Sequence, residues 1–380
     1  MYRQKKIYII YSFILTVVFL LYLSGGILKS NTTMSTFSSM EQLPQLKYND
    51  DRMEILGFYT EPEPPLSGSY GIMQQHSGDL TYIAPFYYRI GDKSGRVEKW
   101  HGITDAQVKN VVDSAHKKNV RVLALVHNLL YGQSGVGRQV AHQVLQDAQS
   151  RGEFITSLLA TVQSADFDGV NIDIEDINYS DRDNFSALVR ETKKAFESYG
   201  LLVTVSVPPE TGQLIPGSWA RNFDYKEIGK WADRVAVMTY DEHGYVTSPG
   251  PVASTKWVDK VIKYTVSVIP QDKVLLGIPA YGFDWTVDKR SPRYLSYKLA
   301  MDVAGSNGVK PEFDQVGEVP YITYAANGEK HQVWFEDARS FKIKADLARK
   351  WGLRGLAIWR LGMEDPAIWK SIGRDFTVAK

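Results

Sequence analysis

Three polar side chains occupy alternate positions of the segment FDGVNIDIED (167–176): Asn171, Asp173 and Glu175. The residues between them are isoleucines, and a valine precedes them. Successive side chains of a β-strand point to opposite faces, so the three polar groups share one face and the aliphatic groups share the other. Burying that polar face among apolar groups would cost free energy. The pattern therefore predicts a strand whose polar face lines a functional site.

The two carboxyl groups on this face are candidates for acid–base chemistry. Glu175 is expected at the end of the strand, in a cleft lined by aromatic residues, where desolvation disfavours the charged form and raises the pKa. A carboxyl group with a raised pKa suits a general acid. Asp173 is then expected to remain ionised beside the protonated Glu175, so that two acids perform two roles.

Other interpretations of these acids are open at this level. An Asp-x-Glu pair could instead hold Mg²⁺. Acids at the end of a strand often serve as loop or helix-cap residues. This structural interpretation is the one favoured for three neighbouring acids: Asp168, Asp176 and Asp181.

Eight short β-like runs, separated by amphipathic stretches, must position these groups. Several runs are nearly continuous Val, Ile and Leu, as in parallel strands covered on both sides. The stretches between them show helical spacing of apolar residues, for example at 104–119 and 181–200. The expected strands are 53–59, 80–90, 120–127, 167–175, 201–207, 233–240, 273–281 and 353–360. This α/β alternation predicts a (β/α)8 TIM barrel, in which chemistry takes place at the C-terminal ends of the strands.

About seventy residues separate the seventh expected strand from the eighth. Loops of this length usually carry structure and function. Within the interval, 319–337 has the pattern of a hairpin that turns at Asn327-Gly328. We therefore expect residues 284–335 to form a small inserted α+β subdomain that supplies one wall of the cleft. Trp285 and Trp334 fit either the cleft wall or the core of this subdomain.

Composition excludes several classes of function. The 380-residue chain has 44 basic and 43 acidic residues and a formal net charge of +1, so the electrostatic footprint of a nucleic-acid-binding protein is absent. Cysteine is also absent, which excludes disulfides, thiolate nucleophiles and cysteine metal clusters. The seven histidines show no paired spacing for a metal. A neutral substrate fits this composition best.

The N-terminus predicts export. Three basic residues precede the uncharged run 7–28, whose length is near the roughly 20 residues that span a bilayer as a helix. Residues 1–28 are expected to be a membrane anchor, or a signal peptide if the chain is cleaved at the small residues of LSGG. A Ser/Thr-rich tether (29–52) would then connect this segment to a catalytic barrel (53–380) outside the membrane, or the barrel would be secreted.

The segment DGVNIDIE (168–175) resembles the Asp-Gly-x-Asp-x-Asp-x-Glu signature of the family-18 glycoside hydrolases, the chitinase-like retaining enzymes. It is similar to the branch of spore cortex-lytic and spore-germination N-acetylglucosaminidases, where asparagine also occurs in this signature. Three further segments resemble elements of the family: VMTYDEHG (237–244), GIPAYGFDW (277–285) and GLAIWRLGMED (355–365). The resemblance covers about 53–375.

The resemblance implies a mechanism in which the substrate supplies the nucleophile. Glu175 would protonate the glycosidic oxygen while the 2-acetamido carbonyl of the bound sugar attacks its own C1. Asp173 would stabilise the oxazolinium ion, and Tyr240 would hydrogen-bond the acetamido carbonyl. Glu175 would then activate water, giving net retention. The mechanism requires no metal or organic cofactor.

The resemblance also implies substrate contacts. Asp241 would contact the sugar, and Trp359 would stack beneath its ring, although an aromatic residue in a barrel strand is also commonly core packing. The remaining candidates for substrate contact are Asn171, Met238, Tyr59 and Phe86. Asn171 departs from the chitinase pattern, where aspartate is usual. With an amide here instead of a carboxylate, Asp173 has one negative charge fewer beside it. Asp173 is therefore expected to ionise more readily and to stay turned toward Glu175.

Together with this resemblance, the sequence predicts an exported, monomeric glycosidase that acts on β-1,4-linked N-acetylglucosamine polymers. The resemblance implies a substrate in peptidoglycan, more specifically in spore cortex, or a chitin-like glycan. Two other hypotheses belong to different classes. A chitinase-like lectin would hold amino sugars without cleaving them, but such lectins typically lose the acid that this chain keeps. A scaffold protein with a vestigial cleft is the third, because fold alone does not fix function.

Overall fold

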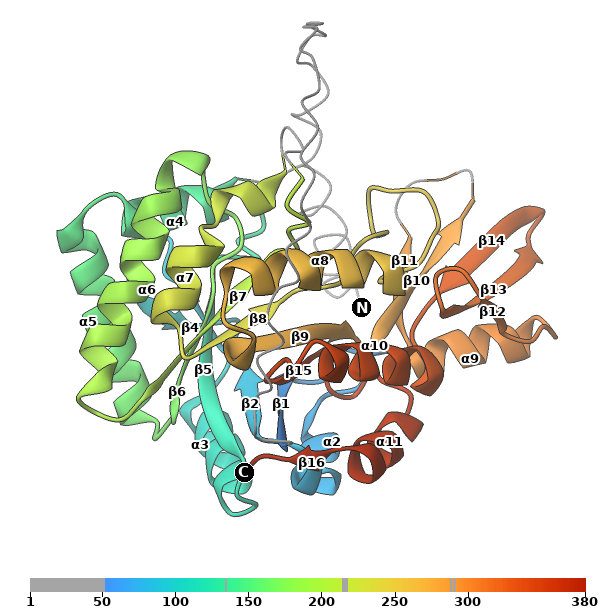
Figure 1. Ribbon diagram of the computed structural model, residues 1–380, viewed down its shortest axis with the longest axis horizontal. Helices are drawn as coiled ribbons and strands as arrows, with labels where there is room; N and C mark the ends of the chain where they lie inside the picture. Colours follow the sequence, from blue (N-terminus) through green and yellow to red (C-terminus); the bar gives the residue numbers. More distant parts are fainter. Residues whose placement is uncertain (1–51, 134, 214–217, 288, 290–291) are drawn as a thin grey trace, which may run out of the picture.

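A closed barrel of eight parallel strands forms the centre of the molecule (Figure 1). The computed structural model describes residues 52–133, 135–213, 218–287, 289 and 292–380. The barrel strands are β1 (Arg52–Tyr59), β2 (Tyr82–Pro85), β5 (Arg121–His127), β6 (Gly169–Asp173), β7 (Leu202–Val207), β8 (Arg234–Val237), β9 (Val274–Pro279) and β15 (Gly355–Trp359). Each strand pairs with the next, and β15 closes the barrel on β1. The predicted (β/α)8 fold is confirmed.

One expected strand is divided in two. The run 80–90 forms β2 and then β3 (Tyr88–Ile90), which pairs with β5 on one side and with the short β4 (Val97–Lys99) on the other. Pro85 ends β2, and proline has no backbone N–H to continue a ladder. The chain therefore bends at Phe86, whose amide donates to the carbonyl of Tyr59 at the end of β1.

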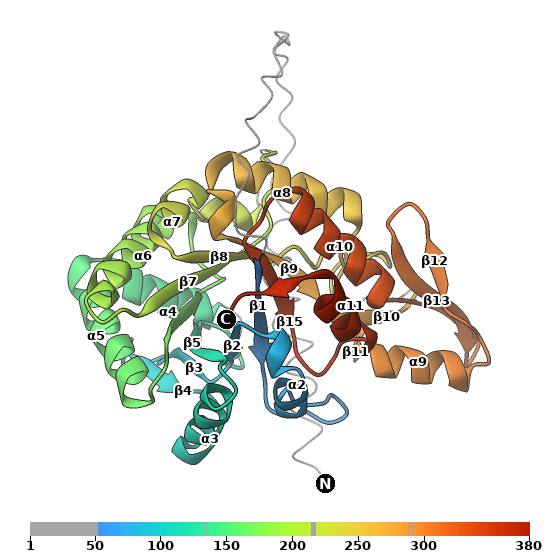
Figure 2. The same ribbon diagram turned by 60° about the horizontal axis from the view of Figure 1, so that its bottom comes forward.

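Helices surround the barrel, as Figure 2 shows by their arc around the strands. They are α2 (Tyr70–Gln75), α3 (Asp105–His116), α4 (Val136–Leu145), α5 (Ala148–Ser164), α6 (Arg182–Glu197), α7 (Tyr225–Trp231), α8 (Thr255–Val268), α10 (Ala338–Lys350) and α11 (Ala367–Asp375). Their buried apolar stripes pack on the outward faces of the strands. In α3, for example, Thr104 forms a capping box with Gln107, which satisfies amides of the first turn.

Alternation along each strand separates two cores. Val170 and Ile172 of β6 belong to the outer core between strands and helices, whereas Leu123 and Leu125 of β5 belong to the core inside the barrel. Asn171 pairs in register with Leu125, so it lies on the inward face. The face that carries Asn171 and Asp173 therefore points into the barrel.

An antiparallel sheet and one helix lie between β9 and α10 in the chain, at the side of the molecule coloured orange (Figure 2). The elements are β10 (Tyr281–Thr286), β11 (Arg293–Ser296), α9 (Tyr297–Ser306), β12 (Glu312–Asp314), β13 (Val319–Ala326) and β14 (Glu329–Trp334), with the sheet order β11-β10-β14-β13-β12. The predicted hairpin turn is confirmed, because Asn327 and Gly328 join β13 to β14 with φ of 52° and 80°. Trp285 is fully buried, whereas Trp334 is half-buried and stacks on Tyr321.

The chain ends in β16 (Thr377–Val378), which pairs with the beginning of β1. The predicted anchor 1–28 and the tether up to residue 51 lie outside the described residues. Within the part of the chain that the structure describes, no helix is long and apolar enough to cross a membrane.

Candidate active site

The carboxyl ends of three barrel strands bring the main candidates to one rim of the barrel. Asp173 is the last residue of β6, and Glu175 lies two residues beyond it. Tyr240 and Asp241 follow β8, and Trp359 is the last residue of β15. Since all the barrel strands are parallel, these ends meet on the same face, where (β/α)8 enzymes place their chemistry.

The environment of Glu175 raises its pKa well above the ordinary value. Burial is the main cause, and the negative charges of Asp173, Asp241 and Asp176 add to it. The expectation of a raised pKa at Glu175 is confirmed. A raised pKa extends the pH range over which a carboxyl group keeps its proton, which suits a general acid.

Asp173 differs from expectation. Its side chain is buried, and desolvation raises its pKa to about 7 although the nearby Ser206 hydroxyl opposes the rise. It is therefore only partly ionised near neutral pH. Having an amide at Asn171 instead of a second carboxylate favours the ionised form of Asp173, but burial disfavours that form more strongly. Both carboxyl groups therefore have raised pKa values, and the predicted division of their roles remains a prediction.

The Asn171 amide is occupied by neighbours on β7. Its Nδ2 donates to Thr204 Oγ1 at 2.9 Å, and its Oδ1 accepts from Ser206 Oγ at 3.1 Å. The residue is fully buried inside the barrel. The structure thus places Asn171 beneath the carboxyl groups as a support for β6 and β7, and its predicted substrate contact remains a prediction.

Tyr240 and Asp241 complete the polar part of the site. Tyr240 is buried, and its hydroxyl lies close enough to the carboxyl groups of Asp173 and Glu175 for their charges to raise its pKa, after burial as the main cause. Asp241 has a left-handed backbone (φ 62°), which costs a non-glycine residue roughly 1 kcal/mol or more. Tyr281 donates a hydrogen bond to Asp241 Oδ1. Asp241 as a whole is exposed, but the protein atoms around its carboxyl group desolvate it and raise its pKa to about 6.

Aromatic side chains form the apolar floor beside these groups. Trp359 is half-buried, with its ring centroid 5.2 Å from Phe58 and 5.9 Å from Phe86. Trp359 therefore combines core packing on one part of the ring with access to solvent on another. The other predicted contacts, Phe86, Tyr59 and Met238, are at most 8 % exposed and so lie below the surface.

Two residues that the sequence did not single out contact the candidate site. Asn128, directly after β5, accepts a hydrogen bond from the Glu175 amide at 2.9 Å. Tyr281 holds Asp241 as described above. The only available signals were their positions, since Asn128 follows a strand end and Tyr281 lies in the segment GIPAYGFDW.

His127 precedes Asn128 and is also buried. Its Nδ1 accepts from the Leu129 amide, and burial lowers its pKa to about 3, so the ring is neutral. In the described part of the chain, no group of three or more His, Cys, Asp or Glu side chains is arranged to hold a metal ion.

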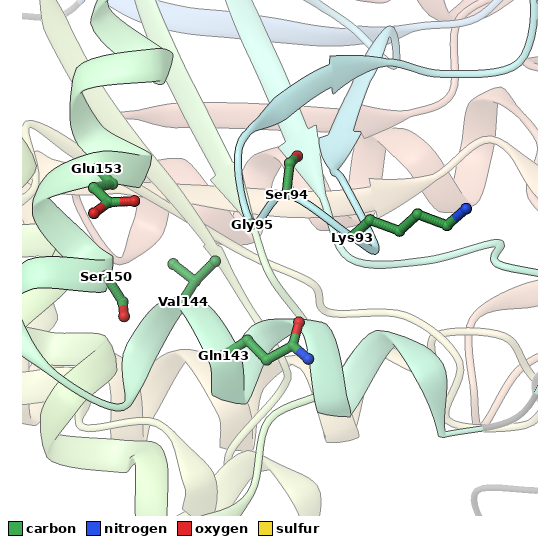
Figure 3. A pocket seen from close by; sticks show the side chains of 7 residues that line it. All are labelled: Lys93, Ser94, Gly95, Gln143, Val144, Ser150 and Glu153. Atoms are coloured by element: carbon green, nitrogen blue, oxygen red, sulfur yellow. The ribbon is translucent and has the colours of Figure 1, made fainter.

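A separate surface hollow of about 210 Å³ lies between the β3–β4 turn and the junction of α4 with α5 (Figure 3). Its lining is mainly polar and consists of Lys93, Ser94, Gly95, Gln143, Val144, Ser150 and Glu153. None of the candidate catalytic residues borders it.

Comparisons with known proteins agree with this fold. Residues 55–364 match the model of the glycosyl hydrolases family 18. The uncharacterized glycosylase YvbX of Bacillus subtilis is 29% identical over 331 residues, which cover 84% of this chain and 94% of YvbX.

Two solved structures are similar over most of the chain. The spore cortex-lytic enzyme SleL of Bacillus megaterium superposes with a TM-score of 0.77 at 27% identity, covering 87% of this chain and 76% of SleL. A chitinase from Chromobacterium violaceum superposes with a TM-score of 0.76 at 27% identity, covering 85% and 98% of the two chains. With a family match that spans most of its length, the chain is a glycosidase that belongs to glycosyl hydrolase family 18.

Proposed function

We propose that this glycosidase cleaves β-1,4-linked N-acetylglucosamine polymers with retention, and that the acetamido group of the substrate is the nucleophile. The observation that carries the proposal is the pair Asp173 and Glu175 at the carboxyl end of β6, where desolvation raises the pKa of both carboxyl groups. Family 18 is an exception among retaining glycosidases, because its reaction is assisted by the substrate and needs no carboxylate nucleophile from the protein.

In the proposed reaction, Glu175 transfers its proton to the glycosidic oxygen as the bond from that oxygen to C1 breaks. The acetamido carbonyl oxygen forms a bond to C1, and the resulting oxazolinium ion is stabilised by ionised Asp173. Tyr240, close to both carboxyl groups, would orient the carbonyl. Water then attacks C1 as the bond from C1 to the acetamido oxygen breaks, and Glu175 takes a proton from this water, which restores the acid. Orienting an intramolecular nucleophile can contribute several kcal/mol to the lowering of the barrier.

A wall glycan is the proposed substrate, with spore cortex as its more specific form. One similar structure is a spore cortex-lytic enzyme and another is a chitinase, so amino-sugar polymers are the class that both names support. We also propose that the apolar segment 7–28 directs the barrel out of the cytoplasm. A wall glycan lies on that outer side of the membrane.

Product analysis tests the proposal. The purified protein is incubated with peptidoglycan, spore cortex fragments and chitin oligomers, and the products are identified by mass spectrometry and by NMR of the new anomeric centre. We expect reducing N-acetylglucosamine ends that appear first as the β-anomer. Binding of the glycan without cleavage would instead identify a lectin. Products that appear first as the α-anomer would exclude the proposed chemistry.

The pH dependence of kcat/KM should follow the two carboxyl groups. The active form needs Asp173 ionised and Glu175 protonated, so the rate should rise as the pH passes about 7, where Asp173 loses its proton. The rate should fall again at higher pH, where Glu175 ionises, since its pKa lies well above the ordinary value. A profile measured from about pH 4 to 10 checks this order. A rate that is maximal at about pH 4 to 5 would contradict it.

Two exposed aromatic residues next to the site should help to bind a polymer. Tyr179 lies in the 3-10 helix η2 (Tyr179–Asp181), and Trp219 lies in η3 (Trp219–Asn222), whose Asn222 bonds to the carbonyl of Ile177. Their exposures are 63% and 40%. Aromatic faces on such a rim offer apolar area to sugar rings.

We expect replacing both Tyr179 and Trp219 by alanine to raise KM for polymeric substrate about 10-fold, as roughly 1 to 1.5 kcal/mol of ring contact is lost. The rate on a chromogenic disaccharide should stay unchanged. Tyr199→Ala is the matched control, because Tyr199 is similarly exposed (57%) but lies before β7, at the opposite end of the barrel. Equal KM values for polymer in both variants would contradict a role in binding.

A further inference from the structure

The segment that follows β6 is held on both sides by side chains from other elements. On the side of α4, Arg138 Nε donates to Asp176 Oδ1 at 2.8 Å. On the side of η3, Asn222 Nδ2 donates to the carbonyl of Ile177 at 2.8 Å. Glu175 is the second residue of this segment, and these two contacts hold the two residues that follow it.

Asn128 has a special place among these contacts because it bonds to the backbone of Glu175 itself. Its Oδ1 accepts from the Glu175 amide at 2.9 Å, and its Nδ2 donates to the carbonyl oxygens of Asp176 at 2.8 Å and Gly137 at 3.1 Å. The residue is fully buried. One amide thus supplies one acceptor and two donors, a combination that aspartate and the aliphatic residues cannot provide.

The contact with Gly137 extends the arrangement to α4. A Cβ atom at Gly137 would lie 2.1 Å from the backbone oxygen of Asn128, so only glycine permits the first turn of α4 to approach this closely. Asn128 therefore connects the end of β5 with the first turn of α4 and with Glu175 and Asp176 after β6.

We infer that Asn128 is a positioning residue that sets where the Glu175 carboxyl group stands relative to the other groups of the site. The inference rests on the proposed role of Glu175. Asn128 fixes the amide of Glu175 and the carbonyl of Asp176, so it restrains the backbone on both sides of the Glu175 side chain. Displacements of about 1 Å can cost a reaction about 10²-fold.

The groups that face Glu175 make its titration a measure of its position. Asp173 faces it from β6, Asp241 and Tyr240 face it from the loop after β8, and Asp176 lies next to it on its own segment. The three aspartates are negatively charged when ionised, and the Glu175 carboxyl group itself is desolvated. A Glu175 side chain that moves toward solvent and away from these groups must therefore lose part of its raised pKa.

The test compares Asn128→Ala with Asn222→Ala in the otherwise unchanged protein. Both variants remove an amide that bonds to the same segment, but Asn222 bonds only to the carbonyl of Ile177 on this segment and leaves Glu175 untouched. The pKa of the Glu175 carboxyl is read by ¹³C NMR, with Glu175→Gln to assign the signal. Steady-state kinetics on a soluble oligomer give kcat and KM.

For Asn128→Ala we expect the pKa of Glu175 to fall by about 1 unit or more toward its ordinary value, as desolvation is relieved. We expect kcat to fall about 10- to 100-fold with KM within about threefold. Asn222→Ala should leave both the pKa and kcat near the wild-type values. Equal behaviour of the two variants would overturn the inference, since a merely structural contact would lower only the melting temperature.

A second variant serves if Asn128→Ala does not fold. Asn128→Asp keeps the shape of the side chain and the acceptor for the Glu175 amide, but it loses both donors. Its kcat should fall with little change in KM, and a wild-type kcat would overturn the inference.

The NMR titration needs no substrate, so it tests the positioning role independently of the proposed function. A wild-type protein that cleaves no amino-sugar polymer would refute the proposed function, while a displaced Glu175 titration would still support the positioning role.

Discussion

Glu175→Gln is expected to lower kcat on amino-sugar polymers by roughly 10²- to 10⁴-fold, the range that positioned proton transfer contributes. The amide has nearly the shape of the acid but cannot transfer a proton to the glycosidic oxygen or take one from water. Glycan binding should persist, because the remaining residues of the site are unchanged. Rates come from release of reducing ends, and binding comes from retention on the insoluble polymer.

The same variant should not lose stability. The pKa of Glu175 is raised in the folded protein, so the folded state binds its proton more tightly than the unfolded state. Stability therefore falls as the pH rises above the ordinary pKa of glutamate, and the non-titrating glutamine removes this loss. Urea unfolding at about pH 7 should give a free energy equal to or above that of the wild type. Glu153→Gln, an equivalent change on the surface of α5, controls for the substitution itself. Hydrolysis by Glu175→Gln at the wild-type rate would show that Glu175 is not the general acid.

The sequence predicted the site best where local pattern and strand geometry agree. Alternation around Asp173 is a property of one short segment, and the inward direction of that face follows from the aliphatic residues that must meet the surrounding helices. The eight runs and their spacing likewise predicted the barrel, because parallel strands covered by helices have continuous apolar sequences. The hairpin at Asn327-Gly328 was predictable for a similar reason, since these residue types favour the positive φ angles that the turn requires.

The contacts that tune the site depend on residues far apart in the chain. Asn128 lies 47 residues before Glu175, and Tyr281 lies 40 residues after Asp241. Neither pairing has a local pattern that would reveal it. The effect of Asn171 on the pKa of Asp173 also depended on how deeply both residues are buried. The hydroxyl groups of β7 bond to the Asn171 amide, and burial still raises the pKa of Asp173.

Asp173→Asn should lower the plateau of kcat by about 10²- to 10³-fold, the range for loss of one electrostatic group that stabilises developing charge. The amide cannot balance the positive charge of the oxazolinium ion. The loss should also depend on pH in a specific direction. Since the pKa of Asp173 is about 7, the wild type lacks most of this charge at about pH 5 and has gained most of it at about pH 8. The ratio of the wild-type rate to the variant rate should therefore grow as the pH rises from about 5 to 8.

The same substitution removes a like charge beside Glu175, so the alkaline limb of the variant should move to lower pH. Asp176→Asn separates the two effects. Its charge also raises the pKa of Glu175, but its carboxylate pairs with Arg138 on the side of α4 and has no proposed contact with the oxazolinium ion. It should shift the alkaline limb while leaving the plateau of kcat within about threefold of the wild type. A rate loss in Asp173→Asn that is the same at about pH 5 and pH 8 would mean that the charge of Asp173 is not what stabilises the intermediate.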